Sequence, residues 1–569
     1  MRSRKVTIVG QTFSLRTHLV NNAKMDLKSR MMEMKTTYDP VEKEWRGPEK
    51  KRLFNDEMSV GEVALYIMRG KNPEDIMQIS DTEGSSMTYG EALTSAIRIA
   101  QHFKKMQLTA DDVVGIFAPN TLYVTPVALA AWFNGTPFQA TNYTFETSVI
   151  EHIYGFIRPK VIFCDGQFYE KVKTASESFK PLIYTLCNHL DNVPKVEDLL
   201  EPTVSEHFYL AQPLTYGPSQ TMAIMVSSGT TGLPKGVCVS NKTCVADFGF
   251  SNGSSTIFST STIDWSTGLF TFIANVLVGG RRILTTKTLT PEYLLELIVK
   301  YKINFLATNP EIMLQLSLLP NYSPQTMQSI RLIFMTGAFC SEATLKRIRS
   351  ALSMGVLVYV YGSTEFGGIV GNLADYKAKS VGKVIHNVKV KIIDRATGER
   401  LGPNQIGEIC ASHGSRWLGY YKNPEASENM IDSEDFIHTG DLGYMDDEHY
   451  LFLTGRCKDI MKFKGFQYSP QVIEDFILEI PDVIDACVFG VFDELKYDVP
   501  AAAVVKCEGS SLTAEEIMEY VRNKSEVPHK QIHYGVFFVK ELPRNHNGKL
   551  LRNKIKDICL ALEKEGKGK

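Results

Sequence analysis

Short apolar runs alternate with amphipathic stretches over most of the chain. The apolar runs that have the length and continuity of buried strands are 113–118, 161–164, 224–226, 303–307, 332–335 and 356–360. Residues 122–133 predict a buried helix between two of these runs. Thr290 can cap a second helix, which Pro291 begins and which places Leu294, Ile298 and Tyr301 on one face. This alternation predicts parallel β–α–β units and therefore an α/β fold.

The length of the chain predicts more than one structural unit. A chain of 569 residues is too long for a single hydrophobic core. The composition shifts near Arg456, and about a hundred residues of mixed α and β pattern follow, which is enough for a small domain. We expect a large N-terminal α/β domain at 34–455 with parallel-rich sheets, a hinge at 456–459, and a small α+β C-terminal domain at 460–569.

Composition excludes several classes of function. Lys and Arg number 62 against 64 Asp and Glu, so no overall basic field is available for nucleic acid. The ten cysteines are scattered without a C-x-x-C pair, which favours reduced thiols in an intracellular protein and no zinc site. No apolar run approaches the roughly 18 residues that a membrane span requires.

Residues 1–33 differ from the rest of the chain. Up to Lys24 they contain basic, serine and threonine residues and no acidic residue, which resembles a mitochondrial presequence. We favour a disordered extension upstream of a start near Met34. The C-terminus carries no Ser-Lys-Leu peroxisomal signal, and we expect a cytoplasmic protein, with peroxisomal or mitochondrial location as alternatives.

A Ser/Thr/Gly-rich segment follows the apolar run 224–226. Its glycines allow close approach to a ligand, its backbone N–H groups and hydroxyls can donate to phosphate oxygens, and Lys235 adds a positive charge. It lacks the Gly-Lys-Ser/Thr order of a Walker A loop. By composition alone, a flexible surface loop is an equal alternative. The candidate phosphate-binding residues are Ser227, Ser228, Gly229, Thr230, Thr231, Gly232 and Lys235.

The segment 227–236 resembles the phosphate-loop signature of the adenylate-forming superfamily, which includes acyl-CoA synthetases, coumarate–CoA ligases and insect luciferases. Further segments resemble the family's other motifs in family order, at 336–338, 360–365, 439–441, 462–466 and 543–549. Each short motif alone also fits a solvated polar turn. Their common order makes the resemblance, which is strongest to insect members of the luciferase-like branch and extends over about 38–556.

The resemblance implies a role for each matched residue. Gly337 and Ala338 line the nucleotide and acyl pockets, and Tyr361 lies against adenine within the segment that contains Gly362. Thr364 contacts the phosphates and Glu365 binds Mg²⁺. It also implies that Asp441 and Arg456 contact the ribose and that Lys458 is the hinge between the domains. Lys462 and Gly465 are implied to lie along the path of the thiol.

The implied chemistry has two steps on a small carboxylic acid. The acid and MgATP first give an acyl-adenylate and pyrophosphate, and Lys549 offsets the repulsion between the two anions. The small domain then rotates about Lys458, and a thiol, most often that of coenzyme A, displaces AMP. Lys549, Thr364, Glu365 and Lys235 are the implied catalytic residues.

The chain departs from its relatives around the acyl pocket, for which we expect Trp265, Thr267, Gly337, Gly368 and Ile369. Trp265 stands where luciferases and several ligases carry histidine, although it could simply pack. Asp247 falls where luciferases have an arginine. Both differences disfavour light emission. We therefore predict an acyl-CoA synthetase for a medium- or long-chain fatty acid or an aryl-propenoic acid. The alternatives are a luciferase-type monooxygenase and a non-catalytic binding protein of the same fold.

Overall fold

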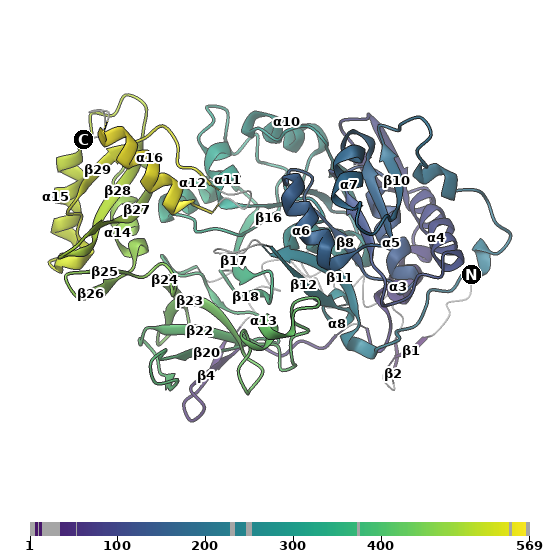
Figure 1. Ribbon diagram of the computed structural model, residues 1–569, viewed down its shortest axis with the longest axis horizontal. Coiled ribbons are helices and arrows are strands. Elements are labelled where there is room, and N and C mark those ends of the chain that lie inside the picture. Colours follow the sequence, from purple (N-terminus) through teal and green to yellow (C-terminus); the bar gives the residue numbers. More distant parts are fainter. Residues whose placement is uncertain are drawn as a thin grey trace.

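The computed structural model describes residues 6–8, 11–13, 35–52, 54–227, 234–245, 253–372, 376–544 and 549–564. Within 1–33, the described residues form a small antiparallel hairpin of β1 (Val6–Ile8) and β2 (Gln11–Phe13). Figure 1 shows a large N-terminal part and a smaller C-terminal domain at one end of the molecule. The predicted α/β class with a small second domain is confirmed.

The N-terminal domain contains two sheets that are largely parallel. The first has the order β10 (Leu182–Cys187), β9 (Val161–Asp165), β7 (Val114–Phe117), β8 (Phe138–Ala140), β11 (Thr221–Ser227) and β12 (Lys235–Ser240). The second has the order β19 (Lys383–Val384), β18 (Gly367–Asn372), β17 (Val356–Ser363), β16 (Leu332–Thr336), β15 (Phe305–Thr308), β13 (Thr256–Ser259), β14 (Arg281–Leu284), β5 (Ile76–Ser80) and β6 (Ser85–Thr88). Antiparallel strands occur at their edges, as β12, β18, β19 and β6.

A third, antiparallel sheet completes the N-terminal domain. Its order is β24 (Leu451–Arg456), β23 (Ile437–Met445), β22 (Gly407–Ser412), β20 (Lys389–Ile393), β4 (Glu44–Arg46) and β3 (Thr37–Asp39), and β21 (Arg400–Leu401) pairs with β20. Strand β4 comes from near the start of the domain and pairs with β20, so the sheet joins segments far apart in sequence.

The helices of this domain pack on and between the sheets. They are α3 (Val60–Arg69), α4 (Tyr89–Lys105), α5 (Val124–Phe133), α6 (Thr147–Ile157), α7 (Tyr169–Ala175), α8 (Asn241–Cys244), α9 (Ser266–Leu277), α10 (Pro291–Tyr301), α11 (Pro310–Ser317), α12 (Glu342–Ser350) and α13 (Pro424–Glu428). Within α10, Thr290 accepts a hydrogen bond from the backbone N–H of Tyr293, as the capping pattern predicts.

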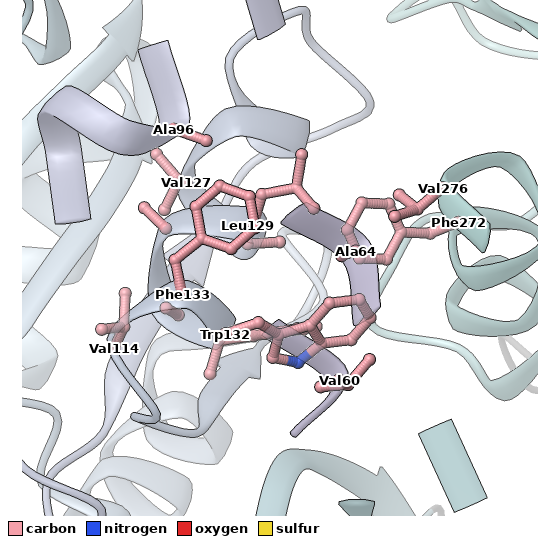
Figure 2. Close-up of a cluster of buried hydrophobic side chains, with 14 of the residues drawn as sticks. Val60, Ala64, Ala96, Val114, Val127, Leu129, Trp132, Phe133, Phe272 and Val276 are labelled. Atoms are coloured by element: carbon pink, nitrogen blue, oxygen red, sulfur yellow. The ribbon is translucent and has the colours of Figure 1, made fainter. Parts of the chain in front are cut away.

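The largest core lies where α3, α5 and α9 meet. Helix α5 is buried on every side, so its sequence is apolar throughout and has no polar face. Figure 2 shows Trp132 of α5 in a cluster with Val60 and Ala64 of α3 and Phe272 of α9. The Trp132 and Phe272 rings lie 5.0 Å apart, and the indole N–H donates to the carbonyl of Met222 on β11 at 3.0 Å. These contacts join the two largely parallel sheets.

The C-terminal domain has its own sheet and its own cores. The sheet has the order β26 (Phe466–Tyr468), β25 (Met461–Phe463), β28 (Tyr497–Lys506) and β27 (Val483–Asp493), with β29 (Gly535–Phe538) parallel to β28. Helices α14 (Pro470–Ile477), α15 (Ala514–Lys524) and α16 (Arg552–Lys564) cover it. Its apolar clusters contain residues of this domain only, among the residues described.

The predicted strands and helices are present with small shifts at their ends. The run 356–360 continues as β17 to Ser363, so Tyr361 and Gly362 lie inside a strand and not after it. No helix in the described part of the chain is long and apolar enough to cross a membrane.

Candidate active site

A cleft of about 2950 Å³ lies between the two domains and contains most of the predicted site residues. Its walls come from β11, β12, the β17–β18 turn, β23, β24, and the segments 484–486, 540–544 and 549–554 of the C-terminal domain. Strand ends of both largely parallel sheets therefore meet the antiparallel sheet at one place.

Two of the phosphate-loop candidates, Ser227 and Lys235, line the cleft from β11 and β12. The last residue of β11, Ser227, and the first of β12, Lys235, face each other across the antiparallel pair, and both line the cleft. The Lys235 side chain is exposed, so its ammonium group is available to an anionic ligand. Ser228, Gly229, Thr230, Thr231 and Gly232 lie outside the described residues, as does Asp247.

A tight turn at 364–366 joins β17 and β18, and Tyr361 and Gly362 lie near the end of β17 just before it. Gly362 is required there, because an added Cβ atom would lie 2.0 Å from the carbonyl oxygen of Gly367 on the adjacent strand. The turn brings Thr364 and Glu365 to the cleft together with Tyr361.

Asp441 is held by two side chains. The Tyr361 hydroxyl donates to its Oδ2 at 2.7 Å, and its Oδ1 lies 3.1 Å from Nε of Arg456. Asp441 and Arg456 are direct partners of the β23–β24 ladder, which explains why residues 15 positions apart in sequence meet. Burial, and next the charge of Asp441, raise the pKa of Tyr361 well above its ordinary value, so its hydroxyl remains a donor.

Lys549 brings the C-terminal domain to this group. Its side chain lines the cleft, and the charges of Arg456, Asp441 and Glu365 act on its pKa. Burial lowers the pKa of Lys549 from its ordinary value, the cation of Arg456 lowers it further, and the carboxylates of Asp441, Glu365 and Asp459 oppose this shift. Lys549, Asp441 and Glu365, which belong to motifs far apart in sequence, thus line the same cleft.

Glu365 and Thr364 fit a Mg²⁺ ion that a nucleotide brings with it. Among the residues described, no group of three or more His, Cys, Asp or Glu side chains could hold a metal. Mg²⁺ is often held by one carboxylate together with phosphate oxygens and water. Glu365 can supply the carboxylate, and the Thr364 hydroxyl lies on the same turn.

The acyl-pocket candidates divide into two groups. Trp265, Thr267, Gly337, Ala338 and Gly368 line the cleft. Ile369 does not, and its prediction was wrong, because successive residues of β18 point to opposite faces of the sheet. Gly368 faces the cleft, so Ile369 points into the core, where it is fully buried.

Aromatic and aliphatic side chains form much of the wall beside Trp265. The rings of Phe270 and Phe334 stack with their centroids 5.0 Å apart, and Ile273 and Val360 also line the cleft. This wall suits an apolar group better than a charged one.

The hinge and thiol-path candidates lie at different places. Lys458 follows β24 and lines the cleft with Arg456. Lys462 and Gly465 belong to the exposed β25–β26 hairpin, outside the cleft, where Lys462 lies over the ring of Tyr497 at 5.1 Å. The structure therefore places Lys549, and not this hairpin, at the site.

Sequence reasoning missed Tyr420. Its hydroxyl donates to Oε1 of Glu365 at 2.9 Å, and the ammonium group of Lys235 lies 4.8 Å from the centre of its ring. No local pattern marks this residue, because it stands in an irregular segment between β22 and α13 and its two partners are distant in sequence.

Together these residues define a two-domain, nucleotide-activating enzyme. Ser227 and Lys235, the Asp441–Arg456 pair and Lys549 from the second domain line one cleft. The AMP-binding enzyme family matches residues 69–421, and the AMP-binding enzyme C-terminal domain matches residues 472–549. The chain belongs to this adenylate-forming family.

The chain is similar over most of its length to several other proteins. It is 30% identical to 4-coumarate–CoA ligase 3 of Oryza sativa subsp. japonica, over 84% of this chain and 88% of that protein. It is 28% identical to luciferin 4-monooxygenase of Photinus pyralis, over 85% and 91% of the two chains. The fold matches an ATP-bound MatB from Rhodopseudomonas palustris with a TM-score of 0.77 at 22% identity, covering 88% of this chain and 100% of that one.

Proposed function

We propose that the chain is an ATP-dependent carboxylate–CoA ligase that acts through an acyl-adenylate. The observation that carries the proposal is that Lys549 of the C-terminal domain lines the same cleft as Asp441, Glu365 and Arg456, whose charges shift its pKa. A cation supplied there by a second domain is suited to a step in which two anions must meet.

The first step follows from this arrangement. Lys235 and the hydroxyls of the turn bind the phosphates, Asp441 accepts the ribose hydroxyls, and Glu365 holds Mg²⁺, which neutralises phosphate charge when bound. A carboxylate oxygen of the acid attacks the α-phosphate of ATP, the bond to the β-phosphate breaks, and pyrophosphate leaves. Lys549 lines the same cleft, and in the proposed step its positive charge stabilises the negative charge that develops in the transition state.

The second step requires a different group at the same place. The thiolate of coenzyme A attacks the acyl carbon of the adenylate, and AMP leaves. Lys549 lines the cleft, whereas Lys462 and Gly465 do not, so we propose that the C-terminal domain rotates about Lys458. Rotation withdraws Lys549 and presents the hairpin of Lys462 and Gly465.

The acid that we propose is a medium- or long-chain fatty acid. The wall formed by Trp265, Phe270 and Phe334 supports an apolar acid in general. Several relatives are named 4-coumarate–CoA ligases, so an aryl-propenoic acid is the second candidate. An apolar pocket discriminates one methylene by only about 1–3 kcal/mol, and a panel of acids must therefore include closely spaced chain lengths.

The test is AMP formation from MgATP with a panel of fatty and aryl-propenoic acids, with and without coenzyme A. We expect an acyl-CoA product, and we expect Lys549→Ala to abolish acid-dependent pyrophosphate exchange. Lys564→Ala, at the exposed end of α16, is the matched control and should retain exchange.

The second half-reaction separates the role of Lys549 from a general loss of structure. Lys549→Ala should still convert a synthetic acyl-adenylate and coenzyme A into the thioester. If no acid supports pyrophosphate exchange in the unmodified protein, the ligase proposal fails. Light emission with luciferin and oxygen would favour the monooxygenase instead.

A further inference from the structure

Backbone hydrogen bonds hold the segment around Tyr420 against β12, the strand that begins with Lys235. The backbone N–H of Cys238 donates to the carbonyl of Gly419 at 3.1 Å, and the N–H of Tyr421 donates to the carbonyl of Gly236 at 2.7 Å. The N–H of Tyr420 itself donates to the hydroxyl of Ser427 at 2.8 Å. The backbone on both sides of Tyr420 therefore moves with β12.

The Tyr420 side chain is also fixed. It is 8% exposed, and the ring of Trp417 meets it edge-to-face with the centroids 5.0 Å apart. A tyrosine has only two side-chain torsions, so a buried ring with a packed face has little freedom left. Its hydroxyl and its free face consequently have defined positions.

The hydroxyl and the ring face each contact a charged side chain of the candidate active site, and the two charges are opposite. The hydroxyl donates to Glu365 at 2.9 Å, and the ring face lies below the ammonium group of Lys235 at 4.8 Å. The described side chains of Lys235 and Glu365 form no ion pair with each other. One phenol thus contacts both a cation and a carboxylate, through its ring face and its hydroxyl.

We propose that Tyr420 is a positioning residue that holds Lys235 and Glu365 apart, so that the cation stays available to phosphate and the carboxylate to Mg²⁺. The inference rests on the proposed function, because it assumes that these two side chains serve MgATP. A direct ion pair would neutralise both groups, and a bound nucleotide would first have to break it. The phenol satisfies each group by a weaker and directional contact, namely a cation–π contact and one hydrogen bond.

Tyr420→Phe tests the hydroxyl and retains the ring. We expect the Mg²⁺ concentration that gives half-maximal ATP binding to change on the order of tenfold, because a hydrogen bond to a charged group is lost. The measurement is calorimetric titration of ATP at a series of Mg²⁺ concentrations, without any acid or coenzyme A. At saturating Mg²⁺ the dissociation constant of ATP should stay within about twofold, because Lys235 keeps its contact with the ring.

Tyr421→Phe is the matched control. It removes the same atom from the adjacent residue, whose ring packs in a different cluster, and it should leave the Mg²⁺ dependence unchanged. A double-mutant cycle adds a second test. In a Glu365→Gln background, Tyr420→Phe should have no further effect on the Mg²⁺ dependence.

The outcomes separate this inference from the proposed function. An unchanged Mg²⁺ dependence in Tyr420→Phe, or an equal change in Tyr421→Phe, overturns the role of Tyr420. If the unmodified protein binds MgATP but activates no acid, the ligase proposal fails while the titrations still decide the role of Tyr420. If the unmodified protein binds no ATP, both the ligase proposal and the proposed role of Tyr420 are contradicted.

Discussion

At the scale of single residues, side chains of the candidate site are held in place by contacts with two other side chains. Asp441 accepts from Tyr361 and pairs with Arg456, so its carboxylate is oriented before a ligand arrives. A group held in this way loses little entropy when it binds, which favours affinity.

Asp441→Ala should weaken ATP binding about tenfold or more, because the ribose loses its acceptor and Arg456 loses its partner. Calorimetric titration of ATP gives the change directly. Asp447→Ala, an exposed carboxylate on the turn after β23, should bind ATP as the unmodified protein does. Equal affinity of the two variants would contradict a ribose role for Asp441.

A buried acid beside the acyl wall gives a pH-dependent contribution to stability. Asp264 precedes Trp265, is 8% exposed and pairs with the Thr262 hydroxyl. Burial raises the pKa of Asp264 from 3.8 to about 6. The folded protein therefore binds a proton more tightly than the unfolded chain, so its stability falls as the pH rises between these values and changes no further above them.

Comparison with Asp264→Asn isolates this contribution. Relative to the variant, the unmodified protein should lose about 2.4 kcal/mol of unfolding free energy between pH 4 and pH 7, most of the roughly 3 kcal/mol that a shift of about two pKa units carries in full. Urea unfolding of both proteins across this range measures the difference. A difference that does not vary with pH would show that Asp264 keeps an ordinary pKa.

At the scale of elements, close helix contacts limit which residues can occupy the core. Gly61 of α3 lies against α5, where an added Cβ atom would be 2.2 Å from the carbonyl oxygen of Trp132. Because that oxygen belongs to a buried backbone, it cannot move aside without shifting a helix that is packed on every side.

Gly61→Ala should therefore destabilise the protein by roughly 2 kcal/mol, the effect of an overpacked core. Gly155→Ala is the matched control in α6, where an added Cβ atom would contact nothing within 4 Å. This change should stabilise the protein by about 0.5–1 kcal/mol, since alanine favours a helix more than glycine does. Denaturant unfolding of both variants tests the pair, and changes of the same sign would contradict the packing argument.

Local sequence patterns predicted the helices and strands better than they predicted contacts between residues that are distant in sequence. The strand β9, the buried helix α5 and the Thr290 cap of α10 follow from runs of apolar residues and a capping sequence, which act over a few positions. Ile369 was misplaced because a tight turn sets which residues of β18 face the cleft, and the sequence does not show this register. Tyr420 was missed because its partners come from two other segments. The order of the family motifs placed Asp441 and Lys549 in one site, which no local pattern could do.

At the scale of the whole molecule, a few side chains join the domains across the cleft. Lys379 of the N-terminal domain lies 2.8 Å from Glu479, which follows α14, and Lys524 of α15 binds the other oxygen of that carboxylate at 2.6 Å. Lys379 is more than half exposed, so this ion pair contributes only a small part of the free energy of the orientation.

Lys379→Glu should lower the rate of acid-dependent pyrophosphate exchange about two- to fivefold, because it adds repulsion only in the orientation that brings Lys549 to the site. The rate of thioester formation from a synthetic acyl-adenylate should not fall. Lys346→Glu makes the same charge change on exposed α12 and should alter neither rate. A parallel loss in both half-reactions of Lys379→Glu would contradict an effect on orientation.

The separate cores of the two domains have a consequence for how such a protein evolves. The apolar clusters of the C-terminal domain contain no described residue from the rest of the chain, so substitutions between the domains leave each core intact. Natural selection can therefore adjust the time spent in each orientation through exposed residues such as Lys379. Descendants of one ancestor could then diverge in the fate of the activated acid without first passing through unstable intermediates.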